Sequence, residues 1–410
     1  MDTRSFGSGN GGDKYDPYDN MARMTTRYGV SSYQYDTAPL MVYWEATRAC
    51  DLACIHCRAE AVRHRHPLEL TTEEGKQLLD QVAAFGTARL PHVVITGGNP
   101  LRRPDIVSLV RHGTERGLSV STTPAGTPRF TADILMRLKE AGITSIALSL
   151  DGSTAARHDE FRQVRGSFDW TRVIARETVR RDIPLQINTM VTAETYDDLV
   201  RIYRLLHGDG ISCWALFFLI PTGRGRGLRQ ISASQSEDLI RWITDLQLSG
   251  DAPFRIKTTE APHFRRVYYD RCREQGANDV EIGASPAAYG FGVRDGNGVV
   301  FISHVGEVFP SGFLPLSVGD VRARSLAEIY RDAPLMRSLR DPEQLLGCCG
   351  RCPARAICGG SRARAFAATG DPLEGDPLCP FNEPSNEPPS PDERPPTNAT
   401  NATDGPIKGR

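Results

Sequence analysis

The sequence predicts an α/β protein, a partial (β/α)6 barrel of the TIM type followed by a small C-terminal unit of a β-hairpin and helices. Between residues 40 and 219, six short apolar runs with strand periodicity alternate with amphipathic helical runs. Strands that alternate with helices form a parallel sheet with right-handed crossovers. A flavodoxin-like open sheet is the alternative, but functional motifs at the carboxyl ends of successive strands favour the barrel.

The expected elements follow the changes of hydrophobic period along the chain. Strands are expected at Leu40–Ala46, His92–Thr96, Leu118–Thr122, Ser145–Leu150, Leu185–Val191 and Ser212–Leu219. Helices are expected at Thr72–Phe85, with Thr71 or Thr72 as N-cap, and at Pro104–Arg116, Thr131–Ala141, Phe168–Arg181, Thr195–Leu206 and Ser234–Gln247. Later come a strand at Phe254–Lys257, a helix at Pro262–Gln275, and a hairpin at Val299–Pro310 that turns at His304–Gly306.

The composition of the chain divides it into five expected segments. The first residues are rich in Gly, Asp, Asn, Ser and Tyr, and the last are rich in Pro, Asn, Ser and Thr, so neither end has the apolar residues of a core. The expected segments are a mobile N-terminal arm (1–38), the barrel (39–250), a bridging region (251–297), a cysteine-containing unit (298–382) and a disordered tail (383–410).

The overall balance of residues excludes several classes of protein. Lys and Arg number 49 and Asp and Glu number 50, so the charge does not indicate nucleic acid or an anionic membrane as a partner. No segment reaches the ~18 to 20 unbroken apolar residues of a membrane span. Residues 1–7 lack the apolar core of a signal peptide. We therefore expect a cytoplasmic protein.

The first cysteine cluster comprises Cys50, Cys54 and Cys57, on a loop that leaves the first predicted strand. Three thiolates suit a cubic iron-sulfur cluster and leave one iron without a protein ligand, which is a place for chemistry. The competing interpretations are zinc, which usually shows paired C-x2-C spacing or histidines, and disulfides, which suit a secreted chain.

The second cluster lies near the end of the chain, at Cys348, Cys349, Cys352, Cys358 and Cys379. C-x2-C-x5-C plus a distant cysteine supplies four thiolates, a full set for either a closed [4Fe-4S] cluster or zinc. Cys213 and Cys272 stand alone, and Cys213 is expected to be a buried strand residue.

The Cys50-x3-Cys54-x2-Cys57 spacing resembles the signature of the radical S-adenosylmethionine (SAM) enzymes. The resemblance implies a partial barrel and a [4Fe-4S] cluster whose open iron chelates SAM. It also implies reduction by a partner such as flavodoxin or ferredoxin. SAM would then yield a 5'-deoxyadenosyl radical that abstracts hydrogen from a small-molecule or peptide substrate.

The resemblance extends to several strand ends. Gly97-Gly98-Asn99 is similar to the family's GGE-type motif, with Asn99 where glutamate is most usual. A glycine pair alone is as typical of a tight turn, but these residues fall in register with strand ends. The resemblance implies SAM contacts at Gly97, Gly98, Asn99, Ser149, Asp151 and Asn188. The run around Asp159, Arg162 and Arg165 is explained either by a salt-linked segment beneath SAM or by a solvated helix face.

The C-terminal cysteines resemble the SPASM or twitch extensions of radical SAM maturases, which favours iron over zinc and implies a small iron-sulfur domain. Ser311 and Ser361 stand where a full SPASM domain has cysteines of another cluster. We therefore expect one auxiliary [4Fe-4S] cluster, with Cys348 as a spare cysteine. Its ligands would be Cys349, Cys352, Cys358 and Cys379.

Within the superfamily, the segments 359–366 and 376–379 look most like the haem-biosynthesis branch. That resemblance implies hydrogen abstraction from a tetrapyrrole side chain. Arg224, Arg226 and Arg229 would then grip propionates bidentately, or else form a solvated loop. The alternatives are a maturase of a ribosomally made peptide, for whose docking module the residues before Cys50 leave little room, and a non-catalytic iron-sulfur carrier, which would not need Gly97 and Gly98 at a strand end.

Overall fold

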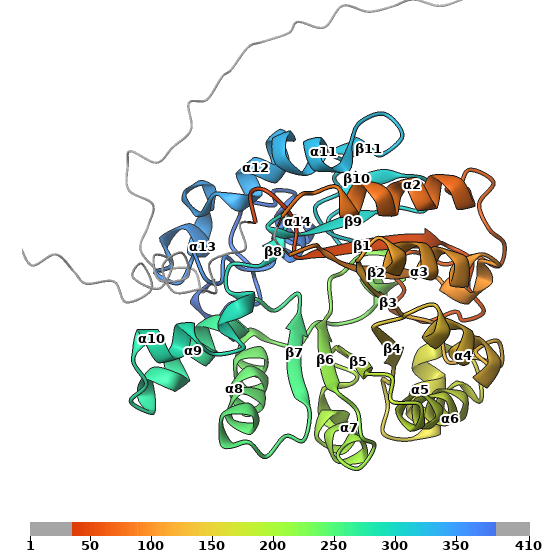
Figure 1. Cartoon of the computed structure of the whole chain (residues 1–410). Helices are drawn as coiled ribbons and strands as arrows, with labels where there is room; N and C mark the ends of the chain where they lie inside the picture. Colours follow the sequence, from red (N-terminus) through yellow and green to blue (C-terminus); the bar gives the residue numbers. More distant parts are fainter. Residues whose placement is uncertain (1–34, 88, 383–410) are drawn as a thin grey trace, which may run out of the picture.

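The computed structural model describes residues 35–382 apart from residue 88 (Figure 1). The predictions for residues 1–34 of the arm and for the tail 383–410 lie outside these residues. Residues 35–38 lie against the C-terminal part of the chain. The Tyr35 carbonyl accepts a hydrogen bond from the Tyr330 hydroxyl, and the Thr37 carbonyl accepts one from Arg331 at 2.7 Å.

In the described part of the chain, 11 strands form a single sheet. They are β1 (Met41–Thr47), β2 (His92–Gly97), β3 (Ser119–Thr122), β4 (Ser145–Ser149), β5 (Leu185–Val191), β6 (Cys213–Phe218), β7 (Arg255–Thr259), β8 (Arg294–Asp295), β9 (Gly298–Ile302), β10 (Glu307–Phe309) and β11 (Gly319–Asp320). The main path runs β11-β10-β9-β1-β2-β3-β4-β5-β6-β7, and β8 pairs with β9 off this path.

The predicted partial barrel is confirmed. Strands β1 to β7 are parallel and follow chain order, and the sheet is not closed, because β7 and β11 end its path. Figure 1 shows the curved sheet with helices on its outer side. Strand β7 extends the six expected barrel strands by one. It gives a weak sequence signal because Ile256 is its only buried residue.

The helices cover the outer face of the sheet and build most of the C-terminal part. They are α2 (Thr72–Ala83), α3 (Ile106–Glu115), α4 (Ala132–Glu140), α5 (Ala155–Arg162), α6 (Ser167–Arg180), α7 (Leu199–Leu206), α8 (Ala233–Ser249), α9 (Phe264–Glu274), α10 (Asp279–Gly283), α11 (Leu326–Asp332), α12 (Pro334–Arg340), α13 (Gly347–Arg351) and α14 (Arg362–Thr369). Helix α5 was not among the expected helices, because Phe161 is its only large apolar residue.

Helix α2 shows how sequence fixes these boundaries. Thr71 is its N-cap, in a capping box with Glu74 in which each side chain accepts a hydrogen bond from the other residue's backbone N–H. Leu78, Leu79 and Val82 recur at helical spacing and are buried against the sheet. Burial of each such side chain stabilises the fold by about 2 kcal/mol.

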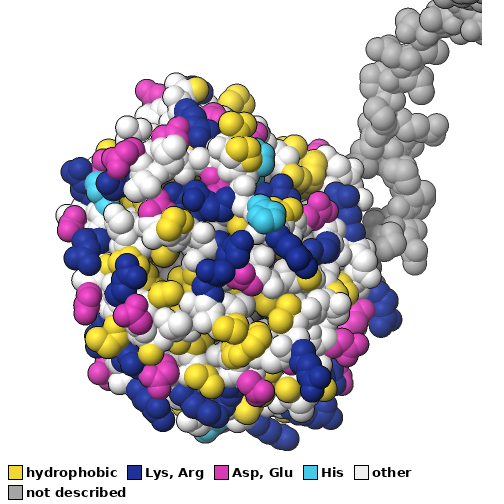
Figure 2. Space-filling model, turned by 90° about the vertical axis from the view of Figure 1, so that its right-hand side faces the viewer, with side chains coloured by type: hydrophobic (Ala, Val, Ile, Leu, Met, Phe, Trp, Pro, Cys, Tyr) yellow, Lys and Arg dark blue, Asp and Glu magenta, His cyan; other side chains and the backbone are white. Residues whose placement is uncertain are grey.

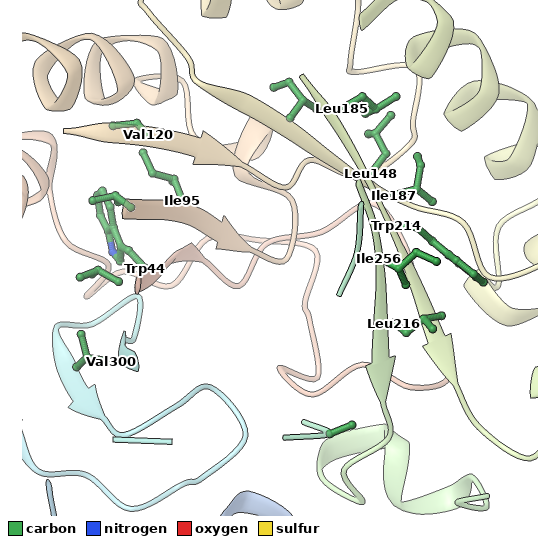
Figure 3. Close-up of a cluster of buried hydrophobic side chains, with 14 of the residues drawn as sticks. Trp44, Ile95, Val120, Leu148, Leu185, Ile187, Trp214, Leu216, Ile256 and Val300 are labelled. Carbon is green, nitrogen blue, oxygen red and sulfur yellow. The ribbon is translucent and has the colours of Figure 1, made fainter. Parts of the chain in front are cut away.

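The main core lies between the outer face of the sheet and the helices, as Figure 3 shows for residues of successive strands. Strand register aligns them, since Trp44 pairs with Ile95, and Trp214 pairs with Ile187 on one side and Ile256 on the other. Side chains alternate along a strand. Consequently the residues next to Trp44, which are Tyr43 and Glu45, point to the inner face of the barrel.

The C-terminal hairpin is confirmed and joins the same sheet. Strands β9 and β10 are antiparallel and flank the turn at His304–Gly306, while β9 pairs in parallel with β1. Arg322 also forms an ion pair with Glu74 of α2, with Nε and Oε1 2.6 Å apart. The C-terminal part is thus an extension of the barrel sheet.

The surface agrees with the nearly balanced charge. Figure 2 shows a face on which basic, acidic and hydrophobic side chains are interspersed. No helix among residues 35–382 is both long and apolar enough to cross a bilayer.

Candidate iron-sulfur and cofactor sites

The loop that follows β1 carries the first three cysteines, with Cys54 buried and Cys50 and Cys57 half-buried. Backbone hydrogen bonds hold it from three directions. The Cys50 N–H donates to the carbonyl of Val62 at 2.8 Å, and the Ile55 N–H donates to that of Phe161 at 3.1 Å. The loop after β6 contributes a third bond, from the Arg224 N–H to the Cys57 carbonyl at 3.1 Å.

Gly97 and Gly98 place the end of β2 directly against the start of this loop. A Cβ atom on Gly97 would lie 2.2 Å from the carbonyl oxygen of Thr47, and one on Gly98 would lie 2.5 Å from that of Ala49. The Gly98 N–H also donates to the Thr47 carbonyl at 2.8 Å. The glycines are needed here because only residues without a Cβ allow this backbone approach.

Asn99 is fully buried and braces the same loop. Its Nδ2 donates to Oδ2 of Asp51 at 2.9 Å, and its Oδ1 accepts from the backbone N–H of Leu101 at 3.2 Å. Arg102 adds an ion pair to Asp51 at 3.0 Å. The Asn99 side chain therefore holds the residue that follows Cys50.

Asp151 and Arg162 reach the loop from β4 and α5. Oδ1 of Asp151 accepts from the Met190 N–H at 2.7 Å, and Oδ2 accepts from Nε of Arg162 at 2.6 Å. Nη1 of Arg162 lies 3.6 Å from Sγ of Cys54. Burial, the largest influence, would raise the pKa of Asp151, but the Arg162 charge together with the other charges and hydrogen bonds around the carboxylate outweighs it and lowers that pKa, which favours the ionised form. Within this run, Arg162 is buried and ion-paired with Asp151, whereas Arg165 is exposed.

Ser149 and Asn188 face each other as paired residues of β4 and β5, and both are half-buried. Oδ1 of Asn188 accepts a hydrogen bond from Gln186 at 2.6 Å. The six residues predicted to contact SAM thus fall into two groups. Gly97, Gly98, Asn99 and Asp151 contact the cysteine loop or its neighbours, and Ser149 and Asn188 lie side by side on adjacent strands.

Two side chains beside the loop have buried polar atoms without hydrogen-bond partners. They are Nδ1 of His56, and Nε and Nη2 of Arg224. The His56 ring is stacked on Phe161, with centroids 4.7 Å apart. Unpaired buried polar atoms are costly and point to a ligand that supplies the missing partners. The cysteine loop therefore has the properties of a site for a polar cofactor.

On the inner face of the barrel, a cluster that sequence reasoning missed connects β1, the cysteine loop and the hairpin. Glu45 accepts from Arg58 at 2.7 Å, and its other oxygen lies 3.1 Å from Nδ1 of His304. The guanidinium of Arg58 lies over the Phe301 ring, 4.6 Å from its centroid. Arg58 immediately follows Cys57, which is the signal that could have indicated it.

The second set of cysteines lines one pocket. The four predicted ligands line it together with Cys348, His263, Arg266 and Asp376. Sγ of Cys349 accepts hydrogen bonds from Nη2 of Arg362 at 3.2 Å and from the Asp376 N–H at 3.4 Å. Cationic and amide donors of this kind stabilise a thiolate.

Ser361, noted above for standing where a cysteine is typical, belongs to a hydrogen-bonded network beside this pocket. Its hydroxyl donates to Oε2 of Glu260 at 2.5 Å, while its N–H donates to Asp376 at 2.8 Å. Asp295 accepts from the Arg362 N–H at 2.9 Å and shares a hydrogen bond with the Glu260 carboxyl group. Burial, and then the Asp295 charge, raise the pKa of Glu260 well above its ordinary value. Glu260 therefore keeps its proton to a higher pH than an exposed glutamate does.

We expect Arg162→Ala to lower the free energy of unfolding by about 3 to 5 kcal/mol, because it leaves the Asp151 carboxylate buried without its cation. Arg180→Ala is the matched control. Arg180 forms an exposed pair with Glu177, and its loss should cost no more than ~0.5 kcal/mol. Chemical denaturation measures both. Equal small losses would contradict the role assigned to Arg162.

The raised pKa of Glu260 predicts that the stability of the folded protein depends on pH. Its raised pKa means that the folded protein keeps a proton which the unfolded chain loses above about pH 4.3. The free energy of unfolding should therefore fall as pH rises above that value, by up to ~1.4 kcal/mol per pH unit. Glu260→Gln keeps a donor toward Asp295 without titrating, so its stability curve should be flatter. Denaturant titrations between pH 5 and 8 test this, and parallel curves would refute it.

Comparison with known proteins places these sites in a family context. Residues 44–206 match the model of the radical SAM superfamily. The chain is 37% identical to an AdoMet-dependent heme synthase of Methanosarcina barkeri over 345 residues, which are 83% of this chain and 96% of that protein. It is 29% identical to a pre-heme d1 synthase of Dinoroseobacter shibae, covering 83% and 85% of the two chains.

The fold has solved counterparts. The Streptococcus suis SuiB structure bound to its precursor peptide SuiA superposes with a TM-score of 0.64 at 16% sequence identity, covering 88% of this chain and 79% of SuiB. At this identity the similarity concerns the fold, a partial barrel with a mostly parallel sheet.

Proposed function

This chain belongs to the radical SAM superfamily, and from that premise we propose that it abstracts hydrogen from a tetrapyrrole side chain in haem-type cofactor biosynthesis. The observation that carries the proposal is the 37% identity to a heme synthase over nearly that protein's whole length. It is supported by the Cys50-x3-Cys54-x2-Cys57 loop, beside which Gly97, Gly98 and Arg162 of the barrel lie.

A [4Fe-4S] cluster would be held by Cys50, Cys54 and Cys57. The site fits such a cluster, because one loop carries the three thiols and buried polar atoms without partners lie beside them. When bound, the cluster and SAM supply the electron and the carbon radical that removes hydrogen from the substrate. The chain's own contribution is to orient the thiolates. The Leu52 N–H and Nη1 of Arg162 donate to Sγ of Cys50 and Cys54 at 3.4 and 3.6 Å.

For SAM itself we propose two kinds of residue. Ser149 is the last residue of β4, and Asn188 lies beside it in the middle of β5. Both are half-buried, and their polar groups would meet SAM directly. Asn99 and Asp151 have their side chains engaged by protein partners, so they would act by positioning the loop. Gly97 and Gly98 would present backbone groups.

We also propose a second [4Fe-4S] cluster, held by Cys349, Cys352, Cys358 and Cys379. Residues 35–382 contain no group of three His, Cys, Asp or Glu side chains gathered closely enough for a single metal ion. Thiolates around a cubane bind different irons and so stand farther apart than those around zinc. Four cysteines around a pocket suit this wider arrangement. Electrons for the first cluster would come from a reductase such as flavodoxin or ferredoxin.

The test is anaerobic reconstitution with iron and sulfide. The wild type should bind about eight irons and the variant Cys349→Ala/Cys352→Ala about four. Cys213→Ala is the control, because Cys213 is buried in β6, away from both cysteine sets, and should keep the full count. A wild type with only about four irons would refute the auxiliary cluster.

The same preparations test the reaction. Reduced wild type given SAM should form 5'-deoxyadenosine, and an iron porphyrin with propionate side chains should increase its yield and lose mass from those side chains. Chromatography and mass spectrometry measure both. Deoxyadenosine formation that no propionate-bearing porphyrin stimulates would overturn the proposed substrate class.

A further inference from the structure

The loop after β6 contains Arg224, Arg226 and Arg229, which the sequence leaves undecided between ligand binding and a solvated surface. In the structure these three arginines differ in how far their side chains are exposed. The Arg229 side chain is 80% exposed and pairs with Glu194 at 3.3 Å, and Arg226 is exposed. Arg224 alone of the three turns polar atoms into the interior, where Nε and Nη2 are buried.

The backbone around Arg224 is fixed on the cysteine loop. Its N–H donates to the Cys57 carbonyl at 3.1 Å. Gly223 has a φ of 52°, and a Cβ there would lie 2.4 Å from the Arg58 carbonyl oxygen. Gly225 also packs against this loop, since a Cβ there would lie 3.3 Å from the His56 carbonyl oxygen. Arg224 is thus held beside the residues that carry the first three cysteines.

The two unpartnered atoms of Arg224 form one edge of the guanidinium group. Nε–H and one Nη2–H point in the same direction and match the two oxygens of a carboxylate. Among residues 35–382, no other arginine has two buried nitrogens without hydrogen-bond partners. Other buried arginines have theirs, such as Arg103 with Asp105 and Arg364 with Asp376.

No residue that the structure describes between 35 and 382 supplies a hydrogen-bonding anion to this edge. Asp151, the carboxylate of the neighbouring cluster, is occupied by Arg162 and by the Met190 N–H. A buried guanidinium edge without partners costs free energy. Nδ1 of His56, also buried and unpaired, adds a polar atom on the same side of the cysteine loop. A ligand that carries a carboxylate would satisfy the arginine.

We propose that the Nε and Nη2 edge of Arg224 is a receptor for a ligand carboxylate. The inference rests on the proposed function, which brings two carboxylates to this loop, that of the methionine part of SAM and those of the tetrapyrrole propionates. Both have the same planar, bidentate chemistry. A lysine at this position would keep the positive charge but could not donate two parallel hydrogen bonds to a carboxylate, so it would restore only part of the binding affinity.

The test compares Arg224→Gln and Arg224→Lys with the control Arg229→Gln, each with clusters reconstituted. Calorimetry measures binding of SAM and of decarboxylated SAM, and absorbance titration measures binding of an iron porphyrin with free propionates and of its methyl ester. We expect Arg224→Gln to bind one carboxylate-bearing ligand at least tenfold more weakly, Arg224→Lys to be intermediate, and Arg229→Gln to stay within twofold of wild type.

The ligand that is affected identifies the source of the carboxylate, and the variant should bind the matching carboxylate-free analogue as the wild type does. Affinities for SAM and porphyrin that both stay within twofold overturn the proposal. So does a parallel loss of both ligands with a lower melting temperature, because an unliganded Arg224→Gln protein should melt no lower than wild type. A wild type that binds SAM but no porphyrin refutes the substrate class, and the SAM titrations then decide the role of Arg224.

Discussion

The structure depends on one constraint, the placement of an eight-residue loop in which Leu52 is buried and Ile55 packs against Phe161, Met190 and Leu219. The loop 50–57 is held by backbone contacts with the end of β2 and by the buried ion pair of Asp151 with Arg162. A buried ion pair contributes little net stability compared with apolar packing, but it fixes a single arrangement. Here that arrangement positions the sulfur of Cys54. The core under the helices stabilises the fold, whereas the residues at the strand ends position the loop.

The second set of cysteines is supported in a similar way. Arg362 is fully buried, and its guanidinium donates to the carbonyls of Pro372 and Glu374 as well as to Sγ of Cys349. Asp376 in turn accepts from Arg364 and Ser361. In both places an arginine connects a thiol to a rigid polar framework. Such an arrangement orients the sulfur atoms of Cys54 and Cys349 before any metal arrives, which lowers the cost of ordering them when it binds.

Much of this could be predicted from the sequence, because the informative signals are local. The N-cap of α2 and the alternation of strand and helix each occupy a short stretch, and the structure confirms both. The cysteine spacings are equally local, and the metal-binding role that they predict stays a prediction. The partners of those stretches could not be predicted. Nothing near Asn99 in the sequence indicates Asp51, and nothing near Arg162 indicates Cys54, since these contacts join residues far apart in the chain. Strand β7 and helix α5 gave weak signals because each has few buried apolar residues. Arg226 and Arg229 are exposed while Arg224 buries polar atoms, and this difference depends on how their loop packs against the cysteine loop.

The parallel pairing of β9 with β1 has a consequence for motion. Four residue pairs, from Met41 with Val299 to Trp44 with Ile302, join the C-terminal part to the first barrel strand, and the same strand leads directly into the cysteine loop. The two parts therefore cannot swing apart like hinged domains without breaking the β1–β9 ladder. If both cysteine sites hold redox centres, a hinge motion would not change the distance over which electrons pass between them.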